Sequence, residues 1–365
     1  MTRNGIEAQA IQHTFDTVNS AYEKWLRSEC DVVTEDLKKK HKRMRKSAFD
    51  FLRATYFRWA ESIESLCPDL RDAPVVLSVG DMHVENFGTW RDGDGRLVWG
   101  INDFDEAAAM PYVWDLVRLA VSADLAPPRR LTAARATQAL LSGYRDGLSA
   151  PRPAVLDQDN RWIRRYVEGS ARADEEFWAG IDACRSGAPP QSVQRALRRI
   201  LPAHTEVVRF AARTAGGGSL GRARYVVVGQ WQGALIVREA KALVPSAWQW
   251  AQGSEPAVIR FQEISNGPYR SPDPHLQVIG RYVYRRLSPD ARKLDLPELA
   301  GNRLTERLLG AMGRDLGAVH AAGRSGKKIL KDLDSRDAKW LKSAAKMARA
   351  HLLADFSAHV EKNAA

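Results

Sequence analysis

The chain has 365 residues, which is long enough for two or three domains or for one unit with two lobes. Hydrophobic residues make up 44% of the sequence and 11 residues are Trp, so the chain can bury a sizeable core, which argues against disorder. Its three cysteines are widely spaced and form no CxxC pair, which argues against a disulfide framework or a zinc cluster and fits a reducing compartment.

The formal net charge of +11 predicts attraction to anions such as nucleotides, phosphorylated metabolites or nucleic acid. No helix-turn-helix, zinc finger or aromatic-basic signature accompanies this charge, so nucleic acid is not the favoured partner. Residues 1–10 are polar and lack an apolar signal core, and no window approaches a membrane span. We therefore expect a cytoplasmic protein that does not contact a membrane.

The N-terminal part is predicted to be helical. Residues 11–27 carry apolar side chains at helical spacing, and Ser47 is suited to cap a second helix that ends before Pro68. Between these helices, residues 38–46 form a basic run. Such a run is most often a solvated face, and the alternative is that some of its side chains contact substrate or nucleotide phosphates.

The stretch 75–106 carries the strongest chemical pattern. A short β-branched run leads into a polar turn, and a second apolar run after a Gly-rich reversal ends in an acidic cluster. Adjacent strand ends can bring such oxygen ligands together around a hard cation such as Mg²⁺. The polar side chains of this stretch are Asp81, His83, Glu85, Asn86, Asp103, Asp105 and Glu106.

Two spacings in this stretch match the chemistry of phosphoryl transfer. Asp81 and Asn86 are five residues apart, as are the catalytic Asp and the metal-binding Asn of the kinase catalytic loop. Asp103 precedes Phe104 on the next strand, where a kinase places its Asp-Phe metal ligand. The alternative is a polar hairpin capped by aspartates, which turns favour in any case.

An amphipathic helix is predicted from Pro111 onward, with Asp115 in its first turn. We expect Asp115 to be a structural anchor that accepts hydrogen bonds from backbone amides of the preceding polar loop. Residues 131–201 are rich in Ala and Arg and are predicted to be mostly helical, with no chemical constellation. Near the C-terminus, a helix over 304–322 ends at His320, which we expect to be a core or capping histidine.

A Gly-rich segment lies between two predicted strands, 207–210 and 225–228. A glycine turn between antiparallel strands lets backbone amides approach phosphates closely. The segment lacks the GK[ST] ending of a P-loop and does not open a helix, so its setting favours the kinase type of phosphate cover. The residues expected to cover the phosphates are Gly217, Gly218, Ser219 and Gly221.

A kinase also needs a cation on a strand of its small lobe to hold the α- and β-phosphates, normally a Lys paired with a Glu from a nearby helix. Arg238 and Lys241 lie on the next predicted strand and compete for that role. The segment 257–263 is the candidate partner helix, with Glu263 as the ion-pair partner.

Several of these segments together resemble a known family. The segments 80–88, 102–106, 114–119 and 238–240 are similar to the domain-of-unknown-function family numbered 2252, and the resemblance extends from about Lys42 to near the C-terminus. The loop 80–88 also resembles the HGDxHxxN signature of aminoglycoside phosphotransferases. Val79 departs from that signature, because those enzymes carry the leading His there.

The resemblance implies an α+β, protein-kinase-like two-lobed fold, but the order of its parts is swapped. Here the Gly-rich loop follows Asp81, whereas in kinases it precedes the catalytic loop, so we expect a circular permutation. The expected parts are 1–202, with the catalytic and metal loops of the large lobe; 203–290, a small β-rich nucleotide-binding lobe; and 291–365, helices that complete the large lobe.

The sequence therefore predicts an ATP- and Mg²⁺-dependent phosphotransferase whose hydroxyl acceptor is an unidentified small molecule. Asp81 would be the catalytic residue, Asn86 and Asp103 the metal ligands, and Asp105 the alternate ligand. Three alternatives stay open: a catalytically silent nucleotide-binding kinase relative that acts as a regulatory or interaction module, a transferase of the AMP moiety, and a metal-dependent hydrolase.

Overall fold

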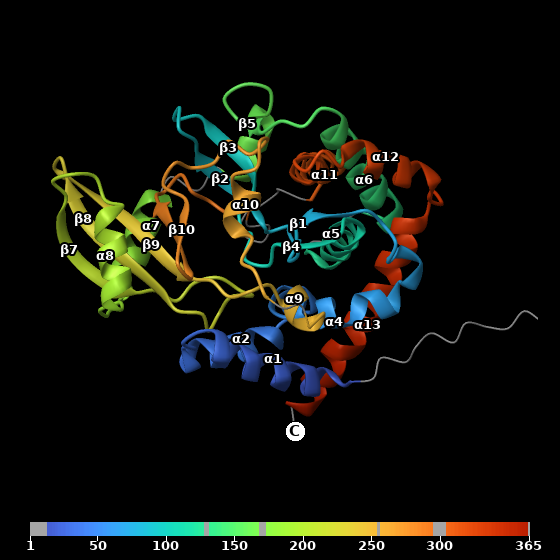
Figure 1. The fold of residues 1–365 in the computed structure, drawn as a ribbon, viewed down its shortest axis with the longest axis horizontal. Helices are drawn as coiled ribbons and strands as arrows, with labels where there is room; N and C mark the ends of the chain where they lie inside the picture. The colour runs from blue at the N-terminus through green and yellow to red at the C-terminus, as the bar shows by residue number, and fades with distance from the viewer. Residues whose placement is uncertain (1–12, 128–130, 168–172, 254–255, 295–303, 364–365) are drawn as a thin grey trace, which may run out of the picture.

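We describe a computed structural model of the chain that covers residues 13–127, 131–167, 173–253, 256–294 and 304–363. The fold is α+β, with small antiparallel sheets and many helices, as the sequence predicts. In Figure 1 a six-stranded sheet lies on one side and most of the helices lie on the other. We call these parts the sheet region and the helical region. Within the described residues, no helix has both the length and the apolar character needed to cross a membrane.

Four helices form the N-terminal part of the helical region. Thr14 and Ser47 cap the first and third of them, and each side-chain oxygen accepts a hydrogen bond from a backbone N–H three residues later. The single helix expected after Ser47 is instead two helices that meet at Thr55, which has non-helical backbone angles. The helices are α1 (Phe15–Glu29), α2 (Thr34–Met44), α3 (Ala48–Ala54) and α4 (Tyr56–Leu66).

The central stretch forms two small antiparallel sheets. Strand β1 (Val75–Ser78) pairs with β4 (Ala108–Pro111), and the hairpin β2 (Phe87–Arg91) and β3 (Leu97–Ile101) adds the short β5 (Ala154–Val155). The polar loop leaves β1 and enters β2, and the acidic loop leaves β3 and enters β4. Because β1 pairs with β4 and β2 pairs with β3, both loops run between the same two sheets.

The remaining helices of this region pack around these sheets (Figure 1). The backbones of helices α6 and α11 are in close contact. An added Cβ at Gly143 would collide with the carbonyl oxygen of Gly310, so only glycine fits there. These helices are α5 (Val113–Leu125), α6 (Ala133–Ser149), α11 (Glu306–Ala321), α12 (Gly326–Ser335) and α13 (Trp340–Lys362), with short 3-10 helices at Pro68–Leu70 and Arg161–Tyr166.

The sheet region is a fully antiparallel sheet in the order β10-β11-β9-β8-β7-β6. Helix α8 (Gln191–Arg199) packs on the face that carries Val227, and α7 (Ala173–Asp182) packs on the opposite face. The strands are β6 (Arg185–Ser186), β7 (Glu206–Ala212), β8 (Arg224–Trp231), β9 (Ala234–Ala242), β10 (Gln277–Ile279) and β11 (Tyr282–Leu287), and the short helices α9 (Ala247–Ala251) and α10 (Phe261–Ser265) follow β9.

Candidate functional site

The polar loop after β1 is held in place by a buried carboxylate. Asp115 on α5 is fully buried and accepts hydrogen bonds from the backbone N–H groups of Val79 (2.7 Å) and Gly80 (2.9 Å). Gly80 has φ +87°, a conformation that favours glycine. The His320 ring lies 3.1 Å from the same carboxylate and is buried in the core. The anchoring role expected of Asp115 and the core position expected of His320 are both confirmed.

Asn86 joins the polar loop to the acidic loop. Its side-chain amide donates to the backbone carbonyls of Asp81 (3.2 Å) and Asp103 (3.0 Å), and its oxygen accepts from the backbone N–H of Asp103 (3.1 Å). These bonds fix Asp81 and Asp103 on either side of Asn86. The three residues singled out by their spacing therefore lie together in space.

Two arginines contact the carboxylates of the polar loop. The fully buried Arg118 of α5 donates to Oδ1 of Asp81 from Nε (3.0 Å) and Nη2 (2.5 Å). Arg53 of α3 forms an ion pair with Glu85. Both bonds from Arg118 go to Oδ1 of Asp81. The other oxygen, Oδ2, faces the glycine segment of the sheet region.

The Gly-rich segment lies against this loop. An added Cβ at Gly218 would lie 2.7 Å from the carbonyl oxygen of Arg53 and 3.3 Å from Oδ2 of Asp81. Arg43 of α2 donates to the carbonyl of Gly216 (3.4 Å), and the carbonyl of Gly221 accepts from a backbone N–H before α2 (2.8 Å). The segment is thus fixed between the N-terminal helices and the polar loop, although more than one hundred residues separate it from Asp81.

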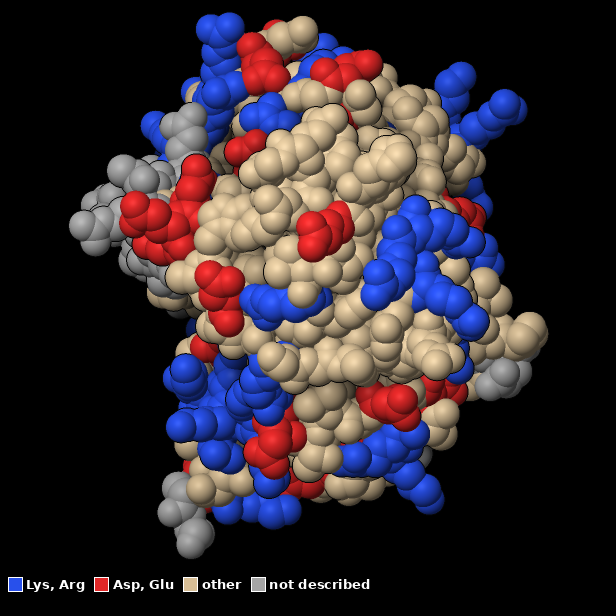
Figure 2. Space-filling view, turned by 90° about the vertical axis from the view of Figure 1, so that its left-hand side faces the viewer, with Lys and Arg blue, Asp and Glu red and all other residues tan. Residues whose placement is uncertain are grey.

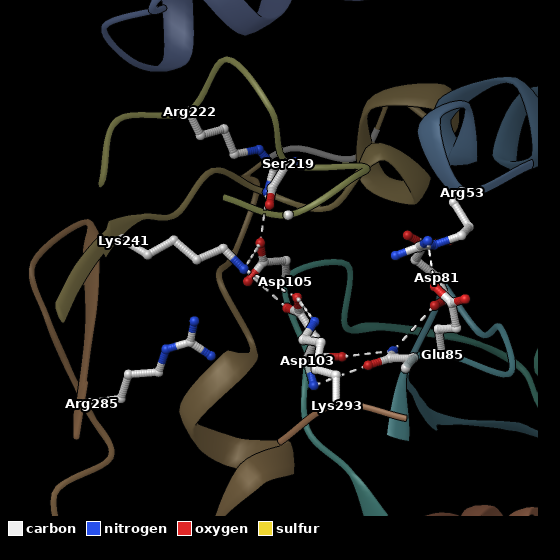
Figure 3. Close-up of polar contacts among 12 residues, drawn as sticks. Arg53, Asp81, Glu85, Asp103, Asp105, Ser219, Arg222, Lys241, Arg285 and Lys293 are labelled. Carbon is white, nitrogen blue, oxygen red and sulfur yellow. Dashed lines mark hydrogen bonds and ion pairs between the residues drawn. The ribbon is translucent and has the colours of Figure 1, made fainter. Parts of the chain in front are cut away.

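The acidic loop meets a lysine of the sheet region (Figure 3). Lys241 on β9 lies 3.1 Å from Asp103 and also forms an ion pair with Asp105, which Arg222 contacts at 3.3 Å. Burial alone raises the pKa of Asp103, but Lys241 and Lys293 hold it well below its ordinary value. Burial and the neighbouring Asp103 carboxylate raise the pKa of Asp105.

The two cations predicted to compete for the phosphates, Arg238 and Lys241, lie on different faces of β9. Side chains alternate along a strand, so Arg238 points to the face of β9 opposite Lys241, where its guanidinium donates to the carbonyl of Val237 (3.1 Å). Of the two, only Lys241 reaches the acidic loop. Glu263 is not its partner. Glu263 is more than half exposed on α10 and pairs with Arg260 at 2.8 Å, one turn away on the same element.

A buried glutamate that the sequence analysis missed lies beside Lys241. Glu239 is fully buried and pairs with Arg213, Arg224 and Arg285 from three neighbouring strands or strand ends. Burial raises the pKa of Glu239, but the three arginines reverse this effect and lower it strongly. The period of two along β9, which places Glu239 and Lys241 on one face, was the available signal in the sequence.

Two cavities that share lining residues lie between the helical and sheet regions. The larger, of about 310 Å³, has an apolar wall that includes Trp90, Phe104 and Leu287 and a cationic wall. The smaller, of about 50 Å³, lies between the polar loop and the glycine segment, and Asp103 and Lys293 line both cavities. The cations that line the larger cavity are Arg43, Arg53, Arg213, Arg224, Arg270, Arg285, Arg286 and Lys293.

The basic run 38–46 has two kinds of side chain. Lys38 and Lys39 are exposed and pair with acidic residues one turn earlier on α2. Lys40 is buried, lies over the rings of Tyr22 and Phe57, and lines the smaller cavity. Burial, with a contribution from Arg222, lowers the pKa of Lys40 to about 8. The reading of a solvated face therefore holds for Lys38 and Lys39, whereas Lys40 lies inside the protein at a cavity.

Comparison with known proteins assigns part of the chain. Residues 32–152 match a family described as an uncharacterized protein conserved in bacteria (DUF2252). Over this stretch the chain is similar to the DUF2252 family, in agreement with the resemblance of its motifs. The DUF2252 segment contains Lys40, Asp81, Asn86, Asp103 and Asp115, and it ends before the sheet region begins. No curated protein and no solved structure matches the chain.

The residues at the acidic loop suit a magnesium ion held jointly with phosphates. The described residues include no cluster of three or more His, Cys, Asp or Glu arranged to hold a metal by themselves. Mg²⁺ is usually bound through one or two carboxylates plus substrate phosphates, and Asp103 and Asp105 supply such a pair. Oδ1 of Asp105 is buried without a hydrogen-bond partner, and the amide oxygen of Asn86 lies next to Asp103. This donor set fits the ion.

Proposed function

We propose that this protein is an ATP- and Mg²⁺-dependent phosphotransferase that acts on the hydroxyl group of a small molecule. One observation carries the proposal: the glycine segment lies directly over Asp81, with Gly218 against its Oδ2, while Lys241 contacts Asp103. These contacts unite the three parts that phosphoryl transfer requires, namely a carboxylate for the attacking hydroxyl, a metal-binding loop and a phosphate cover.

Each of these residues has a distinct task in the proposed reaction. Oδ2 of Asp81 orients the acceptor hydroxyl and takes its proton, while Arg118 on Oδ1 fixes the carboxylate. Asn86 and Asp103 would hold Mg²⁺, with Asp105 as the alternate ligand, and bound Mg²⁺ would supply charge neutralisation at the transferred phosphoryl group.

The donor site is the larger cavity. A nucleoside triphosphate has a planar apolar base and a polyanionic tail, and this cavity pairs an apolar wall with a cationic one. Backbone amides from Gly217 to Gly221 cover the phosphates, and Lys241 holds them. Nucleic acid is the weaker candidate ligand: on the face shown in Figure 2, Lys and Arg side chains form separate groups with acidic and uncharged residues between them.

The proposed fold is a two-lobed, kinase-like one with permuted order. In it, the sheet region corresponds to the nucleotide-binding lobe, with predicted bounds 203–290, and the parts 1–202 and 291–365 form the large lobe. The contact between the glycine segment and Asp81 supports this arrangement, as does the anchoring of the polar loop by Asp115. A cytoplasmic location completes the proposal, and the three free cysteines fit it.

The deciding experiment is a calorimetric titration with ATP, with and without Mg²⁺. Wild type should bind with micromolar affinity in the presence of Mg²⁺, and Asp103→Asn should bind at least tenfold more weakly, because it removes one charged metal ligand. Asp94→Asn is the matched control, since Asp94 is highly exposed on the β2–β3 turn. Absence of Mg²⁺-dependent binding by folded wild type would refute the proposal.

A second experiment identifies the group that is transferred. Release of ADP indicates phosphoryl transfer, and release of pyrophosphate indicates transfer of the AMP moiety. The catalytically silent reading has one observation in its favour: Arg118 already occupies one oxygen of Asp81, and Lys241 occupies Asp103. Tight MgATP binding with no turnover across a panel of hydroxyl acceptors would establish that reading instead.

A further inference from the structure

The smaller cavity contains a lysine whose charge is not balanced by a bonded carboxylate. Lys40 is 4% exposed, and its amine lies 5.8 and 5.6 Å from the ring centroids of Tyr22 and Phe57. A buried ammonium group without an ion-pair partner is costly, because burial disfavours the charged form. Its position therefore needs an explanation.

The carboxylates of the same cavity already have cations of their own. Arg118 holds Asp81, Lys241 holds Asp103 and Asp105, and Arg222 holds Glu106 at 2.7 Å. None of these cations is Lys40. The positive charge of Lys40 is thus left for a group that enters the cavity from outside.

Further polar atoms in the cavity wall also lack partners. Nδ1 of His83 and Nε of Arg53 are both buried without a hydrogen bond, and both residues line this cavity. Burial lowers the pKa of His83 well below its ordinary value, and the nearby Arg53 adds to this effect, so the ring is neutral. On the other side, the glycine segment presents its backbone. Together these groups surround a small space with unused polar atoms.

We propose that the smaller cavity is a cradle for a tetrahedral oxyanion of phosphate size and that Lys40 binds its oxygens directly. The inference rests on the proposed function, in which this oxyanion is the phosphoryl group in transit between the nucleotide and the acceptor. Lys40 then contacts the transferred group from helix α2. A catalytic lysine thus comes from an N-terminal helix, outside both the polar loop and the sheet region.

The test is a calorimetric titration of the full chain with inorganic phosphate at constant ionic strength. Wild type should bind phosphate, and Lys40→Met should bind it at least tenfold more weakly, because a charge-assisted hydrogen bond is lost. Met keeps an unbranched stem beside the two rings. Lys40→Arg keeps the charge and should stay within about threefold of wild type. Lys38→Met, an exposed neighbour on the same helix, is the matched control and should bind as wild type does.

The outcomes separate this inference from the proposed function. If Lys40→Met binds phosphate as tightly as wild type does, or if wild type binds none, the cradle is refuted whatever the result with MgATP. If phosphate binding follows the expected pattern but wild type does not bind MgATP, the cradle stands and the phosphotransferase proposal fails. A purely structural Lys40 would lower the thermal midpoint in Lys40→Met and leave phosphate affinity unchanged, which also refutes the cradle.

Discussion

The two sides of the site hold their charged groups in different ways. On the helical side, side chains bond to backbone: Asp115 holds two amides of the polar loop, and Asn86 holds both the polar and the acidic loop. On the sheet side, side chains pair with side chains, as in the cluster of Glu239 with three arginines. We expect the helical side, whose side chains hold the loops through backbone groups, to set the geometry of the site. We expect the sheet side, which carries the arginines, to receive an anion.

The largest expected effect comes from breaking the fixed side. Asp115→Ala leaves the amides of Val79 and Gly80 buried without an acceptor and also removes one of the two partners of the His320 ring. We expect a loss of about 3–5 kcal/mol in the free energy of unfolding, measured by urea denaturation. Asp146→Ala, which removes a half-exposed partner of Arg314, should cost less than about 1 kcal/mol. A loss of similar size in both variants would contradict the anchoring role of Asp115.

A smaller effect of opposite sign is expected at Lys40. The pKa of Lys40 is about 8 in the folded protein instead of 10.5, so folding disfavours the charged form. The resulting loss in the free energy of unfolding is fully present below pH 8. Lys40→Met should therefore raise the free energy of unfolding at pH 7 by up to about 3 kcal/mol.

The pH dependence checks the sign of that effect. The unfolded chain binds more protons than the folded protein between pH 8 and 10.5, so wild-type stability rises across this window and the advantage of Lys40→Met should disappear. Lys38→Met serves as the control, because Lys38 is exposed. An advantage that stays constant from pH 7 to 10.5 would show that packing, and not charge burial, causes it.

The contact between the two sides can be tested at the glycine segment. An added methyl group at Gly218 would press on the carbonyl of Arg53 and on Asp81. We expect Gly218→Ala to lower the free energy of unfolding by about 1–2 kcal/mol and to weaken MgATP binding about tenfold. Gly180→Ala is the control, since a Cβ there meets nothing within 4 Å and α7 should gain from the substitution. Unchanged MgATP binding in Gly218→Ala would separate the segment from the nucleotide site.

Sequence patterns identified the residues that are close together in the chain. Asp81, Asn86 and Asp103 could be found because their spacing and flanking strands are local properties, and Asp115 because it begins a helix. The convergence of the glycine segment with Asp81 was predicted only through the family resemblance. No local pattern states that residues so far apart meet.

The residues that were missed depend on tertiary structure. The cluster around Glu239 forms because β7, β8 and β11 lie beside β9 in a certain register, and register is set by the whole sheet. Lys40 was hidden among other lysines of a basic run, and only the packing of α2 against Tyr22 and Phe57 distinguishes it. The Glu263 prediction was wrong because α10 directs that side chain to solvent.

The smallest expected effect concerns that corrected residue. Glu263 forms an exposed pair with Arg260, and such pairs contribute about 0–1 kcal/mol to stability. Glu263→Gln should therefore change the free energy of unfolding by less than about 0.5 kcal/mol. It should change MgATP affinity by less than about twofold. Lys241→Met is the contrasting variant and should weaken MgATP binding at least tenfold, because Lys241 is the cation of β9 that pairs with both carboxylates of the acidic loop. If calorimetry gave equal losses of MgATP affinity for the two variants, Glu263 would have to act on the nucleotide site in another conformation.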